Sequence, residues 1–561
     1  MKRTDKYLTL LGLFFFLLGL WHLCRFSPAA TNVAPQRQET AKILLVPLDG
    51  RPPCRQFVID AGHIAGLAVT PPPNELQDYY SQPGDTEGIK QWLSANIETS
   101  QAVILSIDQL LYGGLLTARE KEKTPAERQQ LIAFLRQLHE KHPAVPIYAF
   151  SILPRQTPQD TIDGYWERRH LLAYSRLKGR QAEGLPVSTE ELQKLEAAIP
   201  AESLARYLSH FEENRLLNEE LIQLTKEGVF TQLVLGQDDG EPYTIPNIEK
   251  KRLQQYIHQQ NLPPDKVFLT HGADEIALSL LSLIQNRRAG FKPRVLVKYA
   301  APYMAQRIMP YMAVSIDETV KEKIALLGGE ETTTAEDADF TLYISACDKD
   351  TGDVAARKTA VKQLKANQQE DAPTALVDLS KHFEASETVL PLLIEADYPV
   401  NNLIAYAGWN TTSNAIGTAL AQASIYEACR QQTEDRQEMI GLTAANLTFL
   451  QGRILEDYFY LKDDIELVNQ NLKKAGYINT ADLDLEHNYR WANRMLQNSM
   501  QQHIASYKQT KSARTPVKFT SPAGDFTLMM QDLTAELSYP WPRTFEIWLH
   551  ATPSFAMPSE K

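Results

Sequence analysis

The chain has 561 residues, with 57 Lys and Arg against 69 Asp and Glu, so its formal net charge is −12. Hydrophobic residues make up 43% and charged residues 22%, which is typical of globular proteins and excludes a disordered chain. The acidic balance argues against a general nucleic-acid-binding protein, which needs a basic surface. The four cysteines are too few and too scattered for a disulfide framework or a cysteine-rich zinc site.

The N-terminus carries the strongest indication of cellular location. Residues 7–24 form an uncharged, largely apolar run that follows several basic residues. As a helix this run spans roughly 27 Å, close to the thickness of a hydrocarbon core, and the basic flank predicts a cytoplasmic N-terminus. We expect residues 1–24 to be a single-pass membrane anchor with the body outside the cytoplasm. The alternative is a cleaved signal peptide and a secreted protein, because small residues occur at 27–29. Residues 25–41 lack periodicity and are interpreted as a linker.

From residue 42 onwards, short apolar runs alternate with longer amphipathic stretches. Near-continuous apolar strands between helices indicate a parallel sheet covered on both faces, and therefore an α/β fold. The predicted strands are 42–49, 66–71, 102–108, 146–152, 232–239, 266–275, 294–300, 340–348, 374–380 and 402–410. So many strands exceed one simple doubly wound unit. We therefore expect two doubly wound lobes, with a TIM-like barrel carrying extra strands as the alternative.

The same pattern predicts the domain organisation of the body. The first lobe covers 42–290 and includes a helical insertion at about 155–230, and the second lobe covers 291–415. A helical region follows over 416–510. Three extended stretches near the C-terminus predict a small antiparallel β module over 511–561.

Polar residues gather where the predicted strands end, and this is the edge at which parallel α/β sheets bind their ligands. A single Asp at such a position has an ordinary explanation, since it caps the following helix. Two adjacent acids repel each other and can acquire the divergent pKa values that acid and base roles require. The candidate catalytic residues are the two adjacent pairs, Asp274 with Glu275 and Asp238 with Asp239, together with the strand-end acid Asp108.

The candidate substrate-binding residues follow the same strand ends. They are Asp49, Arg51, Tyr112, Arg155, Trp409, Asn410 and Asn414. Arg51 and Arg155 are suited to holding a carboxylate or phosphate through two hydrogen bonds, although pairing with nearby acids is the structural alternative. Trp409 offers a stacking face beside two amides, a combination found in sugar sites, with core packing as its alternative.

Several catalytic motifs are absent from the sequence, including the glycine-rich phosphate loops, His-Glu-x-x-His, Cys-x-x-Cys and Gly-x-Ser-x-Gly. Cys54 follows a strand end without an evident partner and is interpreted as a packed cysteine. We expect no cofactor and no metal. The alternative is an oxygen-rich site for a divalent cation formed by Asp49, Asp108 and Asp238.

A set of motifs distributed along the body resembles a bacterial family catalogued as domain of unknown function 4127. These motifs are VPLDGRPPC, LSIDQLLYGGLLTAR, LGQDD, HGADE, AGWNTTSNAIGTAL, GRILEDYFY and PWPRTFEIWLHA. The resemblance covers about residues 42–550, and Gly50 departs from it because members commonly carry an acid there. The family name implies no activity, so the resemblance transfers none.

Residues 270–275, THGADE, are also similar to the strand-end motif His-x-Gly-Gly-Asp-Glu of family 20 β-N-acetylhexosaminidases. This resemblance implies that Asp274 orients a substrate acetamido group and that Glu275 is the general acid. With the crowd of strand-end acids, it predicts an exported hydrolase of an extracytoplasmic amino-sugar glycan. The alternatives are a non-catalytic, two-lobed sugar- or anion-binding protein and a metal-dependent phosphoester hydrolase. The expected partners are a polar small molecule or glycan, and the membrane through residues 7–24 if they are retained.

Overall fold

The computed structural model describes residues 31–33, 37–119, 121–158 and 167–558. The predicted anchor, residues 1–24, and most of the predicted linker lie outside the described residues. In the described ranges, none of the helices combines the length and the hydrophobicity that a transmembrane span requires. Within the predicted linker, Thr31–Val33 forms strand β1.

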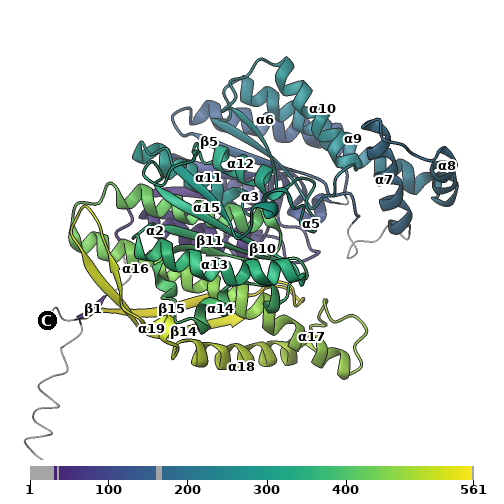
Figure 1. The fold of residues 1–561 in the computed structure, drawn as a ribbon. Coiled ribbons are helices and arrows are strands. Elements are labelled where there is room, and N and C mark those ends of the chain that lie inside the picture. The colour runs from purple at the N-terminus through teal and green to yellow at the C-terminus, as the bar shows by residue number, and fades with distance from the viewer. Residues whose placement is uncertain (1–30, 34–36, 120, 159–166, 559–561) are drawn as a thin grey trace, which may run out of the picture.

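The first of two parallel sheets has six strands in the order β3-β2-β4-β5-β6-β7 (Figure 1). Its strands are β2 (Ala41–Val46), β3 (Leu67–Thr70), β4 (Ala102–Ser106), β5 (Ile147–Leu153), β6 (Gln232–Gln237) and β7 (Val267–His271). The strand order reverses between β2 and β4, which creates the kind of switch point at which open α/β sheets bind ligands. The carboxyl ends of these strands therefore face a natural binding edge.

Helices cover both faces of this sheet and form an insertion beside it. The covering helices are α2 (Gln56–Ala65), α3 (Thr86–Asn96), α4 (Ile107–Tyr112), α5 (Leu115–Ala118), α6 (Pro125–Lys141), α10 (Ile245–Gln259) and α11 (Ile276–Ala289). The insertion consists of α7 (Arg168–Ala182), α8 (Thr189–Ala198) and α9 (Ala201–Lys226), and α7 and α8 project away from the sheets (Figure 1). The insertion has a small apolar cluster of its own, centred on Leu171, Tyr207 and Phe211.

The second parallel sheet has five strands in the order β12-β11-β10-β8-β9. Its strands are β8 (Arg294–Tyr299), β9 (Glu330–Thr332), β10 (Phe340–Cys347), β11 (Thr374–Ser380) and β12 (Leu403–Ala407), accompanied by α12 (Ile316–Leu326), α13 (Thr351–Gln369), α14 (Leu390–Glu395) and α15 (Thr412–Arg430). The predicted α/β fold with two doubly wound lobes is confirmed. The barrel alternative is wrong, because the two sheets are separate and open.

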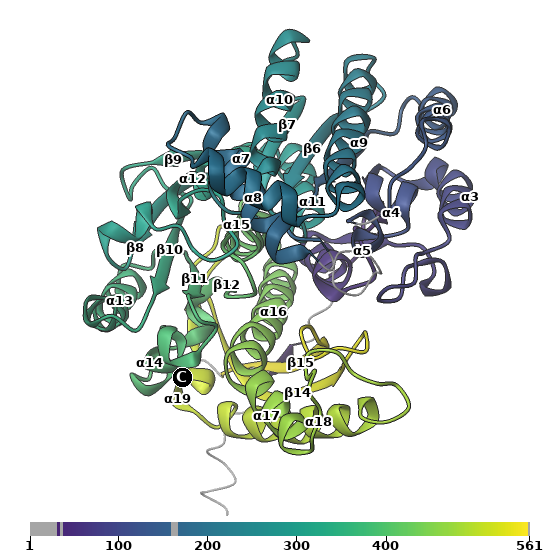
Figure 2. The same ribbon diagram turned by 90° about the vertical axis from the view of Figure 1, so that its right-hand side faces the viewer.

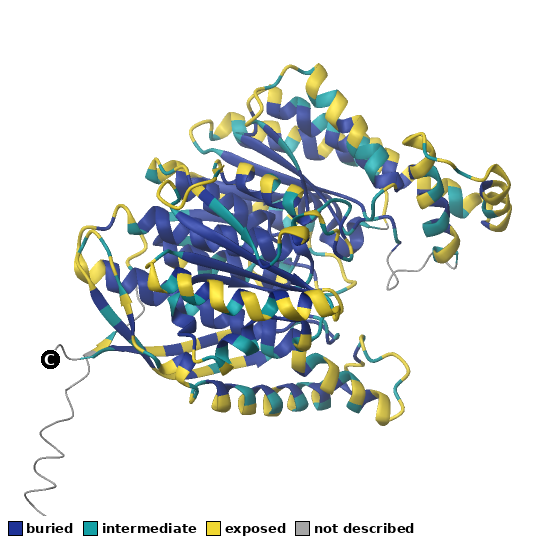
Figure 3. Ribbon diagram, viewed as in Figure 1, coloured by how far each residue is buried: buried dark blue, intermediate teal, exposed yellow. Residues whose placement is uncertain are grey.

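The core lies between the lobes, around helix α15 (Figure 2). Every residue from Thr412 to Cys429 is buried, because α15 packs against α11, α12, α2 and the strands of the second sheet. Gly417 allows this close approach, since a Cβ there would lie 2.4 Å from Cγ of Glu275. The strands of both sheets are buried along most of their length, and the surrounding helices expose their outer faces (Figure 3). The N-terminus of α15 is thereby held between the carboxyl edges of the two sheets.

The C-terminal part lies beneath the two lobes (Figure 2). It comprises α16 (Arg436–Arg453), the π-helical segment η7 (Ile454–Asp464), α17 (Ile465–Lys474), α18 (Tyr489–Tyr507), α19 (Lys511–Arg514), β13 (Val517–Phe519), β14 (Phe526–Ser538) and β15 (Trp548–Met557). The antiparallel sheet has the order β1-β15-β14-β13, so the strand from the predicted linker completes one edge. Helices α16, η7 and α17 follow one another along the chain and lead from the core to the carboxyl edges of the sheets.

Candidate functional site

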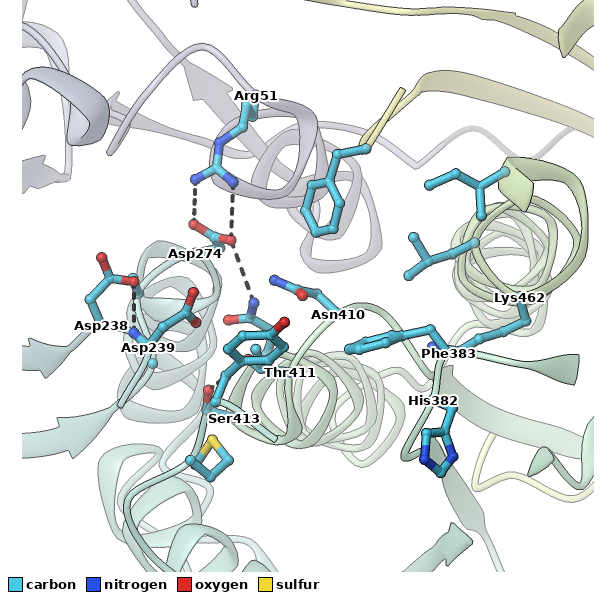
Figure 4. A pocket seen from close by; sticks show the side chains of 18 of the residues that line it. Arg51, Asp238, Asp239, Asp274, His382, Phe383, Asn410, Thr411, Ser413 and Lys462 are labelled. Atoms are coloured by element: carbon cyan, nitrogen blue, oxygen red, sulfur yellow. Dashed lines mark hydrogen bonds and ion pairs between the residues drawn. The ribbon is translucent and has the colours of Figure 1, made fainter. Parts of the chain in front are cut away.

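A polar cavity of about 1060 Å³ lies where the carboxyl ends of the two parallel sheets face each other (Figure 4). The loops after β2, β5, β6 and β7 line it from the first lobe, and the loops after β11 and β12 line it from the second. Segments η7 and α17 and the loop before β15 close the remaining side. Of the predicted site residues, Arg51, Arg155, Asp238, Asp239, Asp274, Asn410 and Asn414 meet at this cavity.

Asp238 and Asp239, which follow β6, have different environments although they are adjacent. Arg119 donates two hydrogen bonds to Asp238, from Nε at 2.7 Å and from Nη2 at 3.0 Å. Burial opposes the charged form of Asp238, but Arg119 and Arg155 outweigh it and lower the pKa. Burial and the charge of Asp238 instead raise the pKa of Asp239 to about 6. Among the described residues, Asp239 forms a loose ion pair, with 4.0 Å between its Oδ2 and Arg155 Nη1.

Arg51 connects Asp274 to the first strand of the sheet. Its Nη2 and Nη1 lie 2.5 and 3.3 Å from the two carboxylate oxygens of Asp274, and its Nε donates to Asp49 at 2.9 Å. The Asn414 amide lies 3.4 Å from the same Asp274 carboxylate. Asp49 is fully buried behind the guanidinium and does not line the cavity. Asp49 therefore holds Arg51 from behind. Arg51 in turn holds Asp274 at the cavity wall (Figure 4).

Glu275 is adjacent to Asp274 in sequence but lies outside the cavity lining. It immediately precedes α11, and its side chain is 1% exposed. Lys323 of α12 forms an ion pair with it at 2.5 Å and also donates to the carbonyl of His271 at 2.5 Å. Burial raises the pKa of Glu275 despite the lysine. The structure therefore gives Glu275 a buried partner and no direct access to a ligand.

Three further predicted residues also lie behind the cavity lining. Asp108 is buried and accepts a hydrogen bond from the backbone of Ile152 at 3.0 Å, and burial raises its pKa to about 7. The Tyr112 hydroxyl donates to Glu213 at 2.8 Å. Trp409 is 2% exposed and packs against Phe545 with ring centroids 5.8 Å apart. These contacts support the loops around the cavity, and Phe545, which Trp409 contacts, itself lines the cavity.

Several lining residues escape a search of strand ends because they come from helices or from the C-terminal loop. They are Arg119, Lys462 and Arg543. Arg543 pairs with Glu546 and lies over Phe545, with 5.4 Å between the guanidinium carbon and the ring centroid. The only sequence signal for these residues is their place in or beside the motifs LLTAR, GRILEDYFY and PWPRTFE, a signal that does not identify their partners.

His271 is held in one orientation at the edge of the cavity. Its Nδ1 lies 2.8 Å from Glu322 Oε2, and its Nε2 lies 2.7 Å from Lys250 Nζ. A neutral ring that donates from Nδ1 and accepts at Nε2 satisfies both neighbours. Burial lowers the pKa of His271, which also favours the neutral ring. The ring therefore supports the wall and has no free nitrogen to exchange protons with a ligand.

Three lining residues other than glycine adopt positive φ angles. These are Tyr311 at 65°, Phe383 at 59° and Asn410 at 51°. Side chains with a Cβ pay roughly 1–2 kcal/mol for this conformation, and such residues cluster at ligand sites. The surrounding loops thus hold these side chains toward the cavity at some conformational cost.

Among the described residues, two groups of potential metal ligands occur near the cavity. Asp49, Cys54 and Asp274 are close enough together, but the Arg51 guanidinium contacts both carboxylates and lies 3.7 Å from Cys54 Sγ. A fixed positive charge in that position does not fit a cation site. The second group is Asp348, His382 and Glu387, in which Lys381 already pairs with Asp348 and His382 with Glu387. The three acids of the predicted ligand set each have a different partner. Asp49 accepts from Arg51, Asp108 from the Ile152 backbone and Asp238 from Arg119.

Comparison with known proteins shows the family to which the chain belongs. Residues 43–550 match the family described as "Protein of unknown function (DUF4127)". The chain belongs to this family. The predicted membership is thus confirmed over nearly the whole chain. A search of curated proteins finds no match. Among solved structures, the first ketoreductase of the tylosin PKS aligns with 10% identity over 72% of this chain and 78% of its own, at a TM-score of 0.16. The function of this DUF4127 member therefore has to be inferred from its own cavity.

Proposed function

We propose that this protein is an exported hydrolase that cleaves a glycosidic bond in an extracytoplasmic, amino-sugar-containing glycan. The observation that supports this most strongly is that two carboxyl groups with different partners line the same cavity. Asp239 has a pKa raised to about 6, and Asp274 is held by the guanidinium of Arg51. Glycoside hydrolysis requires a protonated carboxyl group and an ionised carboxylate on either side of the scissile bond.

In this mechanism Asp239 is the general acid. It donates its proton to the oxygen of the leaving sugar, and the charge of Asp238 favours the protonated form of Asp239 beforehand. Asp274 either attacks the anomeric carbon or removes a proton from a water molecule that does so. Arg51 and Asn414 orient the Asp274 carboxylate for this step. Glu275, paired with Lys323, has no role in proton transfer.

The remaining lining residues suit a sugar. Asn410, Asn469 and Gln470 offer amide donors and acceptors for hydroxyl groups. Phe383 and Phe545 offer apolar ring faces against which the less polar face of a pyranose can pack. The proposed location outside the cytoplasm rests on the hydrophobic N-terminal sequence and not on the cavity.

The test is an activity assay on the full chain, purified in a mild detergent and supplied with muropeptides and aryl N-acetylglucosaminides. Asp239→Asn and Asp274→Asn should each lower kcat/KM by a factor of about 100 or more, because each removes a group that acts in the transition state. The kcat/KM of the wild type should also decline above about pH 6, as Asp239 loses its proton.

Two control variants test whether the loss of activity is specific to Asp239 and Asp274. Asp463→Asn removes an acid from the same cavity lining and should leave kcat/KM within about tenfold of the wild type. Glu275→Gln tests the hexosaminidase resemblance, and its folded fraction should retain turnover. A wild-type rate in Asp239→Asn would refute the assignment of the acid, and loss of turnover in folded Glu275→Gln would restore Glu275 to that role.

A second candidate, a sugar- or anion-binding protein without turnover, is supported by one observation. Both carboxylate oxygens of Asp238 and of Asp274 already accept hydrogen bonds from arginines, so these acids are well satisfied without a substrate. This candidate expects sugar binding with no product released, and an affinity that survives Asp239→Asn. The same assay therefore separates the two functions.

A further inference from the structure

Lys462 is a buried lysine on the wall of the cavity opposite Asp238 and Asp239 (Figure 4). It lies in η7 and is only 6% exposed. Its Nζ lies 4.8 Å from the centroid of the Phe383 ring, a cation–π contact. Among the described residues, no hydrogen bond or ion pair joins the ammonium group to a protein partner.

The nearest acids are occupied by other groups. Asp457 accepts from Arg453 at 2.8 Å and from the Gly408 backbone at 3.0 Å. Asp378 accepts from the backbone nitrogens of Val389 and Leu390 at 2.8–3.0 Å. These carboxylates act on Lys462 only through their charge, without direct contact.

Glu387, the third acid near Lys462, is engaged in the same way. It accepts from His382 at 2.5 Å and from the Ser380 hydroxyl at 2.8 Å. A buried charge without a hydrogen-bonded counter-ion is costly, and the cost is offset when a ligand supplies the counter-ion. Burial lowers the pKa of Lys462 to about 8 while the three acids oppose the change, so the ammonium is still mostly protonated at neutral pH.

The local backbone favours a binding role for this wall. η7 is a π-helical segment, a rare conformation that is frequent at functional sites. Its wider turn brings the consecutive residues Leu461, Lys462 and Asp463 to the cavity lining. Phe383, which faces Lys462, adopts a positive φ of 59°. Both partners of the cation–π contact thus come from unusual backbone.

We propose that Lys462 and Phe383 form a subsite for the carboxylate of an acidic sugar, which deepens the proposed glycan hydrolysis and rests on it for the identity of the substrate. A single ammonium balances the single charge of a carboxylate, whereas a doubly charged phosphate would keep one negative charge without a counter-ion in this wall. Phe383 packs against the apolar part of the same residue. Asp239, the proposed proton donor, lies on the opposite side of the cavity from Lys462 (Figure 4), so the acidic sugar occupies a position away from the scissile bond.

The experiment compares N-acetylmuramic acid with N-acetylglucosamine, which differ by a lactyl ether that carries a carboxylate. Binding is measured by calorimetry on the full chain, and because both probes are free monosaccharides without a glycosidic bond, hydrolysis does not consume them. N-acetylmuramic acid should bind at least about tenfold more tightly, which corresponds to about 1.4 kcal/mol. Lys462→Met should abolish this preference and leave the affinity for N-acetylglucosamine within about twofold.

Two further variants test whether the effect is specific to the charge and the position. Lys462→Arg keeps the charge and should retain a preference for the acidic sugar. Lys474→Met removes an exposed lysine of α17 and should leave the preference unchanged. A circular dichroism spectrum of each variant confirms that the fold is retained before binding is compared.

The possible results separate the subsite from the proposed reaction. Equal affinity for the two sugars, no binding of either, or a preference that survives Lys462→Met would overturn the subsite. A stronger, Lys462-dependent affinity for N-acetylglucosamine 6-phosphate than for N-acetylmuramic acid would overturn its assignment to a carboxylate. A Lys462-dependent preference in a protein whose wild type hydrolyses no glycan supports the subsite and counts against hydrolysis alone.

Discussion

Two buried lysines lie near the cavity, and their surroundings differ. Lys323 is 1% exposed and forms an ion pair with Glu275 at 2.5 Å beneath the end of β7. Lys462 is 6% exposed and lies over the face of Phe383, and among the described residues its ammonium has no hydrogen-bonded or ion-paired partner. The first ammonium has its counter-ion within the protein, whereas the second is the one for which we propose a bound carboxylate.

This difference shows that pairing, and not the position of a residue along a strand, decides which charges are available for chemistry. Glu275 stands at a strand end beside Asp274, yet its partner Lys323 removes it from the site. Asp239 stands beside Asp238, and because Arg119 pairs with Asp238, Asp239 is left with a weaker partner. The partner that the tertiary structure gives to each acid therefore sets its proposed role: Lys323 encloses Glu275, Arg51 orients Asp274, and Asp239 is left with a loose contact.

The largest expected effect concerns stability. Lys323→Met leaves Glu275 buried without a counter-ion and should lower the free energy of unfolding by about 3–5 kcal/mol. Lys462→Met removes a charge that has no direct partner and should change it by less than about 1 kcal/mol, or raise it. Urea unfolding followed by circular dichroism measures both variants. If Lys462→Met proves the more destabilising, the contrast between the two lysines is wrong.

A smaller effect is expected from Asp239 as the pH changes. Because its pKa is raised to about 6 in the folded protein, its contribution to stability is present at low pH and is lost as the pH rises through about 6. Asp239→Asn should therefore be more stable than the wild type by about 1–2 kcal/mol at pH 7.5, a figure reduced for partial exposure, and about equal to it at pH 4. Unfolding midpoints at the two pH values provide the measurement. A stability difference that stays constant between them would show that Asp239 is paired more tightly than the structure indicates.

The smallest effect tests the backbone at the cavity wall. Asn410 has a φ of 51°, which Ala tolerates poorly and Gly tolerates well. Asn410→Ala should therefore be about 1 kcal/mol less stable than Asn410→Gly. Both variants lack the amide, so any loss of sugar affinity should be the same in both. Unequal affinities would mean that loop geometry, and not the amide, supports binding.

Much of the fold was predictable from apolar patterning. Every predicted strand run overlaps a strand of the structure, because strands buried on both faces must be apolar throughout. The short strand β9 was missed because its three residues are largely exposed and polar. The π-helical segment η7 was not predictable either, since its sequence has an ordinary helical pattern and its widened turn depends on packing against the core.

The candidate site was predictable in outline only. Asp238, Asp239 and Asp274 follow strands whose ends meet at one edge, so their proximity follows from the parallel sheet. Arg119 and Lys462 lie far from these acids in sequence and carry no strand-end signal. Their roles depend on the side chains that surround them, which periodicity does not report.

The sequence by itself determined the α/β class, the buried strands and the edge at which polar side chains collect, because burial on both faces of a parallel sheet imposes a local apolar pattern. Only the tertiary structure decided which charges neutralise one another. Ion pairs such as those of Glu275 with Lys323 and of Asp238 with Arg119 join residues from different elements, and their energies depend on distance and burial. The net charge of −12 therefore says little about the site, whose chemistry depends on the partner that the fold gives to each charge.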